Sequence, residues 1–344
     1  MDISVLGGLG VRENGVSITP TAPKPRQVLA LLALRADQVV SVTTLTEELW
    51  GGRPPRSARA TLQTYVLQLR ELIGAALERD PADGPARSAK DVLVTVPGGY
   101  LLNTSGGQCD VREFERLAGT GYRAMDAGDF PGAARQLRGA LSLWSGAALA
   151  DVQTGALLSM EVRRLEETRL CALDQRIDAD LRLGRHRELL GELSVLVSRY
   201  PTHETLHGQF MLALHRSGRR TEALETYQRL RRALVRELGL EPSAALRRLQ
   251  RSVLMAGPDS AAAHDSAAAA PARTERSGWA DVTASAAGQG VRGGARARCR
   301  PAPPPRPPPP GPVAHPAAPA PTAHTTPRSP RPTERTPLEQ PHVQ

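Results

Sequence analysis

One stretch of the sequence combines cationic side chains with short polar side chains in a way that suits contact with nucleic acid. It covers residues 53–74 and reads RPPRSARATLQTYVLQLRELIG, with four arginines and no acidic residue between positions 53 and 70. Arginines contact phosphates, whereas short hydroxyl and amide groups hydrogen-bond to base edges in the major groove of DNA. The stretch therefore predicts a segment that binds DNA, with arginines at its margin.

A helix is expected to position these side chains. Pro54 and Pro55 disfavour a helix and Ser57 can cap one, so the helix should begin near Ser57. Its apolar residues recur at helical spacing and form one buried stripe: Leu62, Val66, Leu69 and Ile73. At about 3.6 residues per turn, the opposite face presents Ala60, Thr61, Thr64 and Gln68, flanked by Arg56, Arg59, Tyr65 and Arg70. Because every amphipathic helix has a polar face, the pattern also fits a helix whose polar side is only solvated.

A hairpin is expected after this helix. Val92, Val94 and Val96 alternate with other residues, 97–99 reads PGG, and an extended run resumes at Tyr100. Alternation followed by a glycine turn and a second extended run indicates two antiparallel strands. A helix followed by a two-stranded wing is the winged helix-turn-helix arrangement, which favours the DNA-binding interpretation.

Residues 1–104 are expected to form the complete winged helix, a small α+β domain. Short β-branched runs broken by glycines predict two or three strands at its start, and a buried helix is predicted at 26–35. A short link at 39–42 should lead to a second helix, opened by a capping box at Thr44 and Glu47. This second helix and the helix from residue 57 would then form the helix-turn-helix.

Residues 110–255 are expected to form an all-α, tetratricopeptide-like domain. Gly128, Gly184 and Gly218 each follow one predicted helix and open the next, and the last two lie 34 residues apart, which is the tetratricopeptide period. The longer gap between the first two predicts a linker at 145–158. The final helical run should close the stack with Leu246, Leu249 and Val253.

The motifs of the chain, taken in order, resemble those of the Streptomyces antibiotic regulatory protein family. VLALLAL, VVSVTTLTEELWG, PPRSARATLQTYVLQLR and VPGGYLL are similar to an OmpR-type winged helix. FERL, ALSLWSGAALADV and GRRTEALETYQRLRRALVRELGLEP are similar to the bacterial transcriptional activation domain of the same regulators. The resemblance implies that 57–74 is the recognition helix and that 92–102 is the wing.

The resemblance also implies roles for single residues. Gln68 stands where OmpR-type proteins often carry a base-reading arginine, and glutamine there favours adenine over guanine. Tyr65 and Arg70 stand where contacts to the DNA backbone lie in that pattern. The wing lacks the arginine that is usual in OmpR-type proteins, which leaves Lys90 and Thr95 as its polar candidates for DNA contact.

The function that the resemblance implies is transcriptional activation of a secondary-metabolite (antibiotic) biosynthetic gene cluster. It implies binding to double-stranded DNA at direct repeats upstream of promoters, as a dimer or as tandem protomers, and recruitment of RNA polymerase holoenzyme. Removal of residues 110–344 is expected to leave DNA binding intact and to abolish activation. A competing interpretation is a protein-interaction scaffold whose winged helix does not read DNA sequence, and the 11 basic against 10 acidic residues in 1–104 support it.

The composition of residues 256–344 is typical of a disordered tail. Positions 258–344 hold 19 of the 30 prolines and show no apolar periodicity, so this segment should not bury a core. No sign of an enzyme was found, since neither lysine follows a glycine to make a GxxxxGK loop and the histidines lack spacing such as HExxH. No cofactor, metal or membrane contact is expected, and the lack of a long apolar run predicts a cytoplasmic, nucleoid-associated protein.

Overall fold

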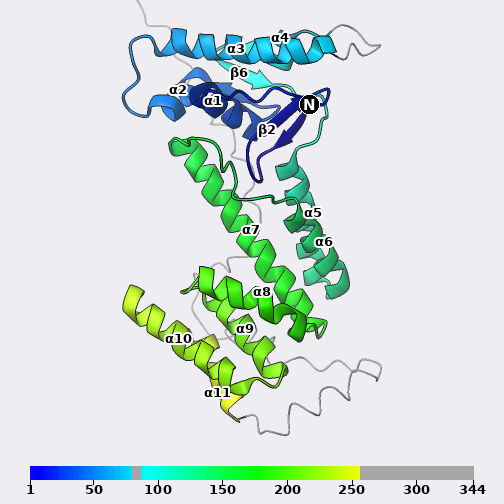
Figure 1. The fold of residues 1–344 in the computed structure, drawn as a ribbon, viewed down its shortest axis with the longest axis vertical. Helices are drawn as coiled ribbons and strands as arrows, with labels where there is room; N and C mark the ends of the chain where they lie inside the picture. The colour runs from blue at the N-terminus through cyan, green and yellow to red at the C-terminus, as the bar shows by residue number, and fades with distance from the viewer. Residues whose placement is uncertain (80–86, 256–344) are drawn as a thin grey trace, which may run out of the picture. The chain divides into compact units, whose positions relative to one another are not determined.

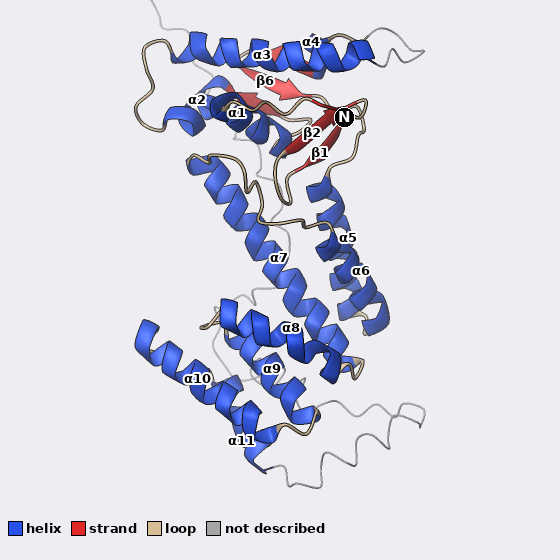
Figure 2. Cartoon of the chain, in the orientation of Figure 1, coloured by secondary structure: helices blue, strands red, loops and turns tan. Residues whose placement is uncertain are grey.

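The structure, a computed structural model, describes residues 1–79 and 87–255. A region of short strands and helices comes first and an all-helical region follows, so the described chain is mainly α (Figure 1, Figure 2). This confirms the predicted fold class, a winged helix followed by a tetratricopeptide-like helical domain. None of the described helices is both long and apolar enough to cross a membrane. The tail predicted to be disordered, 256–344, lies outside the described residues.

The N-terminal region contains the helices and strands of a winged helix. It has two antiparallel three-stranded sheets, with strand orders β1-β2-β3 and β4-β6-β5. The predicted N-terminal meander and the predicted hairpin β5–β6 are therefore confirmed. The elements are β1 (Asp2–Ser4), β2 (Gly10–Glu13), β3 (Val16–Ser17), α1 (Pro23–Leu34), β4 (Val39–Ser41), α2 (Val42–Trp50), α3 (Ala58–Arg79), α4 (Ala89–Val92), β5 (Leu93–Val96) and β6 (Gly99–Leu102).

The segment 39–42, predicted as a link, instead contains strand β4. This strand pairs with β6, and Val40 lies opposite Tyr100 while Ser41 lies opposite Gly99. The close approach of the two strands requires a glycine at position 99, because a Cβ there would lie 2.4 Å from the carbonyl oxygen of Val40. The prediction was wrong because the partner of this strand lies far along the chain, and three residues give no local periodicity.

Two helix starts also differ from those predicted. α1 begins at Pro23 rather than at Arg26, because the first helical position needs no N–H donor and suits proline. α2 is capped by Ser41, whose hydroxyl oxygen accepts a hydrogen bond from the backbone N–H of Thr44 at 3.0 Å. The capping box predicted at Thr44 and Glu47 was therefore wrong, since both residues lie inside the helix.

The second region consists of helices joined by short turns. Gly128, Gly184 and Gly218 adopt φ angles of 77°, 80° and 82° and each separates two helices, as predicted. The linker occupies 143–155 rather than 145–158. The helices are α5 (Asp110–Asp126), α6 (Phe130–Ser142), α7 (Ala156–Arg182), α8 (His186–Arg199), α9 (Glu204–Arg216), α10 (Arg220–Leu238) and α11 (Ala244–Met255).

Two large hydrophobic cores, which divide inside α7, and a small cluster of Ala133, Ala134 and Ala179 hold the described residues together. The first core joins the winged helix to α5, α6 and α7 as far as Ala172, and in it Phe114 and Trp144 meet edge to face at 5.4 Å between ring centroids. The second core joins the remainder of α7, from Ile177, to the helices that follow. It includes Leu246, Leu249 and Val253, as predicted. The winged helix therefore shares its core with the first helices of the second region.

Candidate nucleic-acid interface

The predicted recognition helix, α3, is anchored by one buried stripe. Its four apolar residues are each at most 2 % exposed and belong to the first core, as predicted: Leu62, Val66, Leu69 and Ile73. The helix contacts α1, α2 and α4 (Figure 1). The helix extends to Arg79, so Gly74, the expected end, lies inside it. A Cβ at Gly74 would meet open space. The opposite side of α3 is exposed within the part of the chain that the structure describes.

That opposite side and the N-terminal end of the helix carry four of the nine predicted DNA contacts. Thr64 and Gln68 are exposed along the helix, and Arg56 and Arg59 are exposed at its N-terminal end. The hydroxyl of Thr64 donates a hydrogen bond to the carbonyl oxygen of Ala60 at 3.2 Å, one turn earlier. The structure thus brings the small polar residues and the two arginines to one accessible surface.

Four further predicted contacts lie at the edge of this surface. Thr61 and Tyr65 are half-buried, and Tyr65 packs against the first core. Arg70 donates to the carbonyl oxygen of Leu93 from Nε at 3.1 Å and from Nη2 at 2.7 Å. Its Nη2 also donates to the hydroxyl of Thr95 at 2.7 Å. Arg70 and Thr95 therefore connect α3 to the first strand of the wing.

Lys90 precedes the wing rather than lying on it. It is exposed in α4, a single turn in which the N–H and hydroxyl of Ser88 donate to Oδ2 of Asp91 at 2.9 and 2.7 Å. Those bonds raise the population of the charged carboxylate and lower the pKa of Asp91. The lysine side chain remains exposed beside β5.

Sequence reasoning missed three exposed residues on this side of α3. Leu67 is 57 % exposed, and Gln63 and Glu71 are exposed as well. The helical spacing of four, three and four residues that defines the buried stripe also defines a row on the exposed side of the helix. We call this row the central row of α3; it contains Ala60, Thr64, Leu67 and Glu71. The spacing would have revealed Leu67, but a leucine was expected to be buried.

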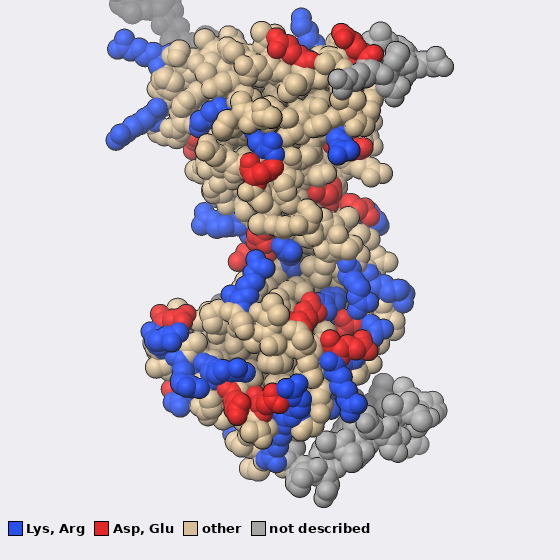
Figure 3. Space-filling view, viewed as in Figure 1, with Lys and Arg blue, Asp and Glu red and all other residues tan. Residues whose placement is uncertain are grey.

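The charge on this surface is concentrated at the start of α3. Arg53, Arg56 and Arg59 are exposed, and no acidic residue in 1–79 or 87–255 pairs with them. Figure 3 shows basic side chains projecting from the end of the winged helix where the loop between α2 and α3 lies. Exposed arginines beside a helix N-terminus, which itself attracts anions, are suited to phosphates.

The helix-turn-helix is also connected directly to the second region. Glu48 of α2 is buried, and its Oε2 accepts from the backbone N–H of Leu157 at 2.9 Å and of Leu158 at 3.0 Å. Its Oε1 accepts from the N–H of Gly155 and from Nε2 of Gln27, the latter at 2.8 Å. A carboxylate that binds the free N–H groups at the start of α7 is stabilised by the helix dipole.

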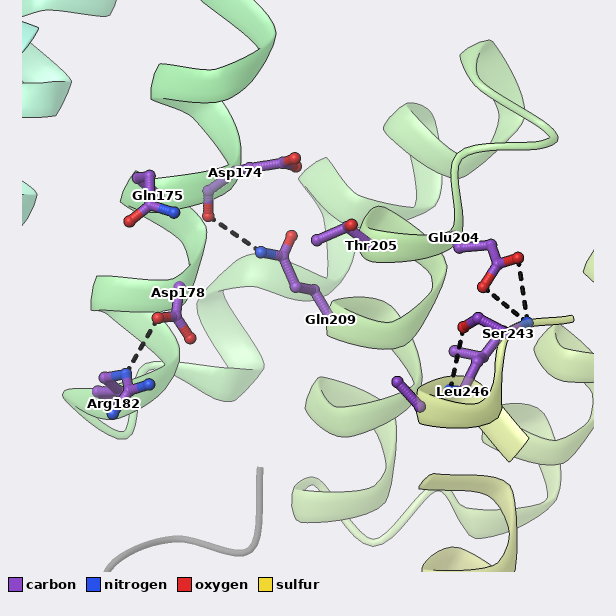
Figure 4. A pocket seen from close by; sticks show the side chains of 10 residues that line it. Asp174, Gln175, Asp178, Arg182, Glu204, Thr205, Gln209, Ser243 and Leu246 are labelled. Carbon is purple, nitrogen blue, oxygen red and sulfur yellow. Dashed lines mark hydrogen bonds and ion pairs between the residues drawn. The ribbon is translucent and has the colours of Figure 1, made fainter. Parts of the chain in front are cut away.

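A second concave site lies between α7, α9 and the start of α11 (Figure 4). It encloses about 450 Å³, and some of its polar groups bind one another, whereas Oδ1 of Asp174 and Oε1 of Gln209 are buried without a hydrogen-bond partner among the described residues. Nε of Arg182 donates to Asp178 at 3.0 Å, and the carboxylate of Glu204 accepts from the N–H of Ser243 at 3.0 Å. No group of three potential metal ligands exists within the described residues. The surface of α3 is therefore the better candidate for function.

Comparison with known proteins places both regions in regulatory families. Residues 17–83 match the family described as "Transcriptional regulatory protein, C terminal", and residues 109–254 match the "Bacterial transcriptional activator domain". The chain is 54 % identical over 258 residues to the regulatory protein DnrI of Streptomyces peucetius, which covers 75 % of this chain and 93 % of DnrI. It is 37 % identical to the regulatory protein AfsR of Streptomyces coelicolor over 74 % of this chain but only 24 % of AfsR.

A solved structure resembles the fold as well. Mycobacterium tuberculosis EmbR, in complex with a low-affinity phosphopeptide, matches with a TM-score of 0.66 and 30 % sequence identity. The match covers 78 % of this chain and 69 % of the EmbR chain. With an OmpR-type winged helix, a bacterial transcriptional activator domain and nearly the full length of DnrI matched, the chain belongs to the Streptomyces antibiotic regulatory protein family of transcriptional activators.

Proposed function

We propose that the chain is a sequence-specific activator of a secondary-metabolite biosynthetic gene cluster. The observation that carries this proposal is the exposed side of α3, where uncharged side chains suited to bases lie beside arginines that have no acidic partner among the described residues and are suited to phosphates. The similarity to DnrI, a regulatory protein, supports the same assignment. The competing function, a scaffold that does not read DNA, leaves this exposed side of α3 without a role.

Within this proposal the residues of α3 divide between bases and phosphates. Gln68 hydrogen-bonds an adenine through its amide, and Thr64 lies beside the same strand of DNA. Arg56 and Arg59 contact phosphates at the N-terminal end of the helix, and Thr61 approaches the backbone at its edge.

The remaining predicted residues support the interface from its margins. Tyr65 and Lys90 contact the DNA backbone, while Arg70 and Thr95 keep the wing fixed against α3 through the hydrogen bonds described above. Because Arg70 already binds Leu93 and Thr95, its main contribution is to position the wing.

We further propose that two protomers bind direct repeats on the same side of the duplex. One recognition helix reads only a few base pairs, and a domain of nearly balanced charge gains little from nonspecific attraction. Repeats that recur at about one helical turn, 10–10.5 bp, would let both helices face one side. Inserting half a turn between repeats should abolish cooperative binding, and inserting a full turn should restore part of it.

RNA polymerase holoenzyme is the proposed protein partner, with the helical region as its docking surface. The bonds from Glu48 to the start of α7 support this assignment, because they couple α2, which packs against the DNA-reading helix α3, to the helical region. When the winged helix binds DNA at one position, the position of the helical-region surface that contacts RNA polymerase would be fixed as well.

The test is binding of the purified chain to promoter regions of neighbouring biosynthetic genes, followed by transcription in vitro with RNA polymerase holoenzyme. A sequence-specific complex and increased transcript are expected. Gln68→Ala should lose about 1–3 kcal/mol of discrimination at one base pair while nonspecific affinity changes little. Equal affinity for promoter and scrambled DNA would favour the scaffold function instead.

A further inference from the structure

We infer that Leu67 reads the 5-methyl group of a thymine in the major groove, so that each bound repeat contains one thymine recognised by apolar contact. This inference rests on the proposed DNA-binding function and specifies one base of its target.

Leu67 is an exception among the aliphatic residues of α3 from Leu62 to Leu69. Leu62, Val66 and Leu69 are at most 2 % exposed, whereas Leu67 is 57 % exposed. A single exposed leucine is ordinary on a protein surface, so exposure alone does not indicate a role. Its position does, because at about 100° per residue Leu67 projects about 130° from the middle of the buried stripe, on the exposed side of α3, with Gln68 at the same angle on the other flank.

The neighbours of Leu67 in the central row are suited to bases rather than to phosphates. Ala60 and Thr64 precede it and are uncharged, and the hydroxyl hydrogen of Thr64 is already donated to the carbonyl oxygen of Ala60. Glu71 follows it, and a carboxylate is repelled by the DNA backbone. The cations stand at the margin, at Arg56 and Arg59. The centre of α3 should therefore meet the floor of the major groove.

Thymine offers the matching group. In the major groove the four bases present hydrogen-bond donors and acceptors, and only thymine adds a methyl group at C5. A leucine against that methyl would bury apolar surface on both partners, while cytosine at the same place would leave the leucine against a polar edge. Loss of one such methyl contact should weaken binding by about three- to tenfold.

The experiment replaces thymine by deoxyuridine, which removes only the methyl group and keeps base pairing. The sequence protected by the full chain on promoter DNA is resynthesised with one deoxyuridine at a time, and affinities are measured for the wild-type chain and for Leu67→Ala. For the wild type, one position per repeat should lose about three- to tenfold on substitution. For Leu67→Ala, thymine and deoxyuridine at that position should bind equally.

Two control variants separate Leu67 from its surroundings. Leu72→Ala changes a less exposed leucine of the same helix, 36 % exposed, and should keep the difference between thymine and deoxyuridine. Thr64→Ser removes the methyl group of the neighbouring residue and should also keep the difference in affinity between thymine and deoxyuridine. Because Leu67 is exposed, Leu67→Ala should keep the melting temperature of the wild type.

The outcomes distinguish this inference from the proposed function. Sequence-specific binding without any deoxyuridine-sensitive position, or with a sensitivity that Leu67→Ala retains, would overturn the role of Leu67 and leave the proposed function standing. A sensitivity lost in Thr64→Ser but kept in Leu67→Ala would assign the methyl contact to Thr64 and overturn the inference. Absence of sequence-specific binding would overturn both.

Discussion

Within the described residues Arg56 and Arg59 have no acidic partner, in contrast to several arginines of the helical region. Arg138 and Arg176, for example, both bind the buried carboxylate of Asp180. A guanidinium that is not neutralised within the protein can release counterions from DNA phosphates when it binds them. The two arginines at the start of α3 are therefore expected to set affinity rather than sequence choice.

Arg56→Ala and Arg59→Ala should each weaken binding to all DNA sequences alike. Each should also reduce the slope of log affinity against log salt by about 0.9, the value for one phosphate contact. Arg135→Ala is the matched control, because Arg135 is exposed on α6 and should leave the slope unchanged. Unchanged slopes for both α3 variants would place these arginines outside the interface.

A second prediction at the residue scale concerns pH. Burial raises the pKa of Asp174 to about 7, and it lowers the pKa of His203, whose Nε2 lies 3.8 Å from Oδ2 of Asp174. The folded protein thus retains a proton on Asp174 that the unfolded chain releases near its ordinary pKa of 3.8. Since the folded state binds more protons at this carboxyl, the contribution of Asp174 to the free energy of unfolding should fall as the pH rises from about 4 to about 7, whereas the lowered pKa values of His186, His203 and His207 act in the opposite direction.

Asp174→Asn should remove the fall in the free energy of unfolding that accompanies deprotonation of Asp174. The variant should be more stable than the wild type at pH 8, by on the order of 1–2 kcal/mol after allowance for partial exposure, and nearly equal to it at pH 4. The measurement is the melting temperature at both pH values, with the exposed Asp126→Asn as control. A gain that is the same at pH 4 and pH 8 would contradict the titration.

At the scale of elements, the carboxylate of Glu48 holds α2 against the start of α7. Glu48→Ala should lower the free energy of unfolding by about 2–4 kcal/mol, because it leaves the N–H groups of Leu157 and Leu158 buried without an acceptor. Glu47→Ala, which changes the exposed neighbour, should cost little. Chemical denaturation of both variants gives the comparison, and equal midpoints would show that the contact contributes nothing.

The elements with local signals were predictable from the sequence, and those with distant partners were not. The stripe of α3 and the hairpin around Gly98 depend on residues a few positions apart, and both were found. Strand β4 depends on β6, and the bonds of Glu48 depend on α7, so neither left a trace in the nearby sequence. Leu67 was missed for another reason, since apolar residues were assigned to the core by type rather than by position.

At the scale of the whole molecule, the first core extends across the predicted domain boundary at residues 104–110. The backbone N–H of Ser145 and of Leu149, in the linker, donate to the carbonyl oxygens of Leu6 and Val5 at 2.9 and 3.0 Å. Phe114 and Trp144 belong to the same core as the winged helix. The earlier expectation that the winged helix binds DNA without residues 110–344 therefore needs revision.

A protein ending at residue 109 should be unfolded or aggregated, because it would expose the apolar surface that packs on α5 and α6. A protein ending at residue 182, after α7, should retain the first core and bind DNA. Circular dichroism and gel shift on both proteins make the test. A folded, DNA-binding protein ending at residue 109 would show that the shared core is dispensable.

A corresponding truncation experiment tests whether the last helix, α11, is needed for the second core. α11 contacts α9 and α10, and its Leu246, Leu249 and Val253 are buried, so a protein ending at residue 240 would bare the apolar faces of those helices. A protein ending at residue 257 keeps α11 and should melt with the full chain, since the removed tail has no periodic apolar face. The protein ending at 240 should melt far lower or aggregate.

Point variants of α11 show whether its buried side chains stabilise the second core when the helix keeps its full length. Leu246→Ala removes a side chain that is 2 % exposed and should cost about 2–5 kcal/mol of unfolding free energy. Leu254→Ala removes the same groups from a side chain that is 47 % exposed and should cost little. Equal melting of the proteins ending at 240 and 257 would show that α11 is not needed to close the stack. Melting of the protein ending at 257 well below the full chain would show that the tail packs on the body, contrary to its composition.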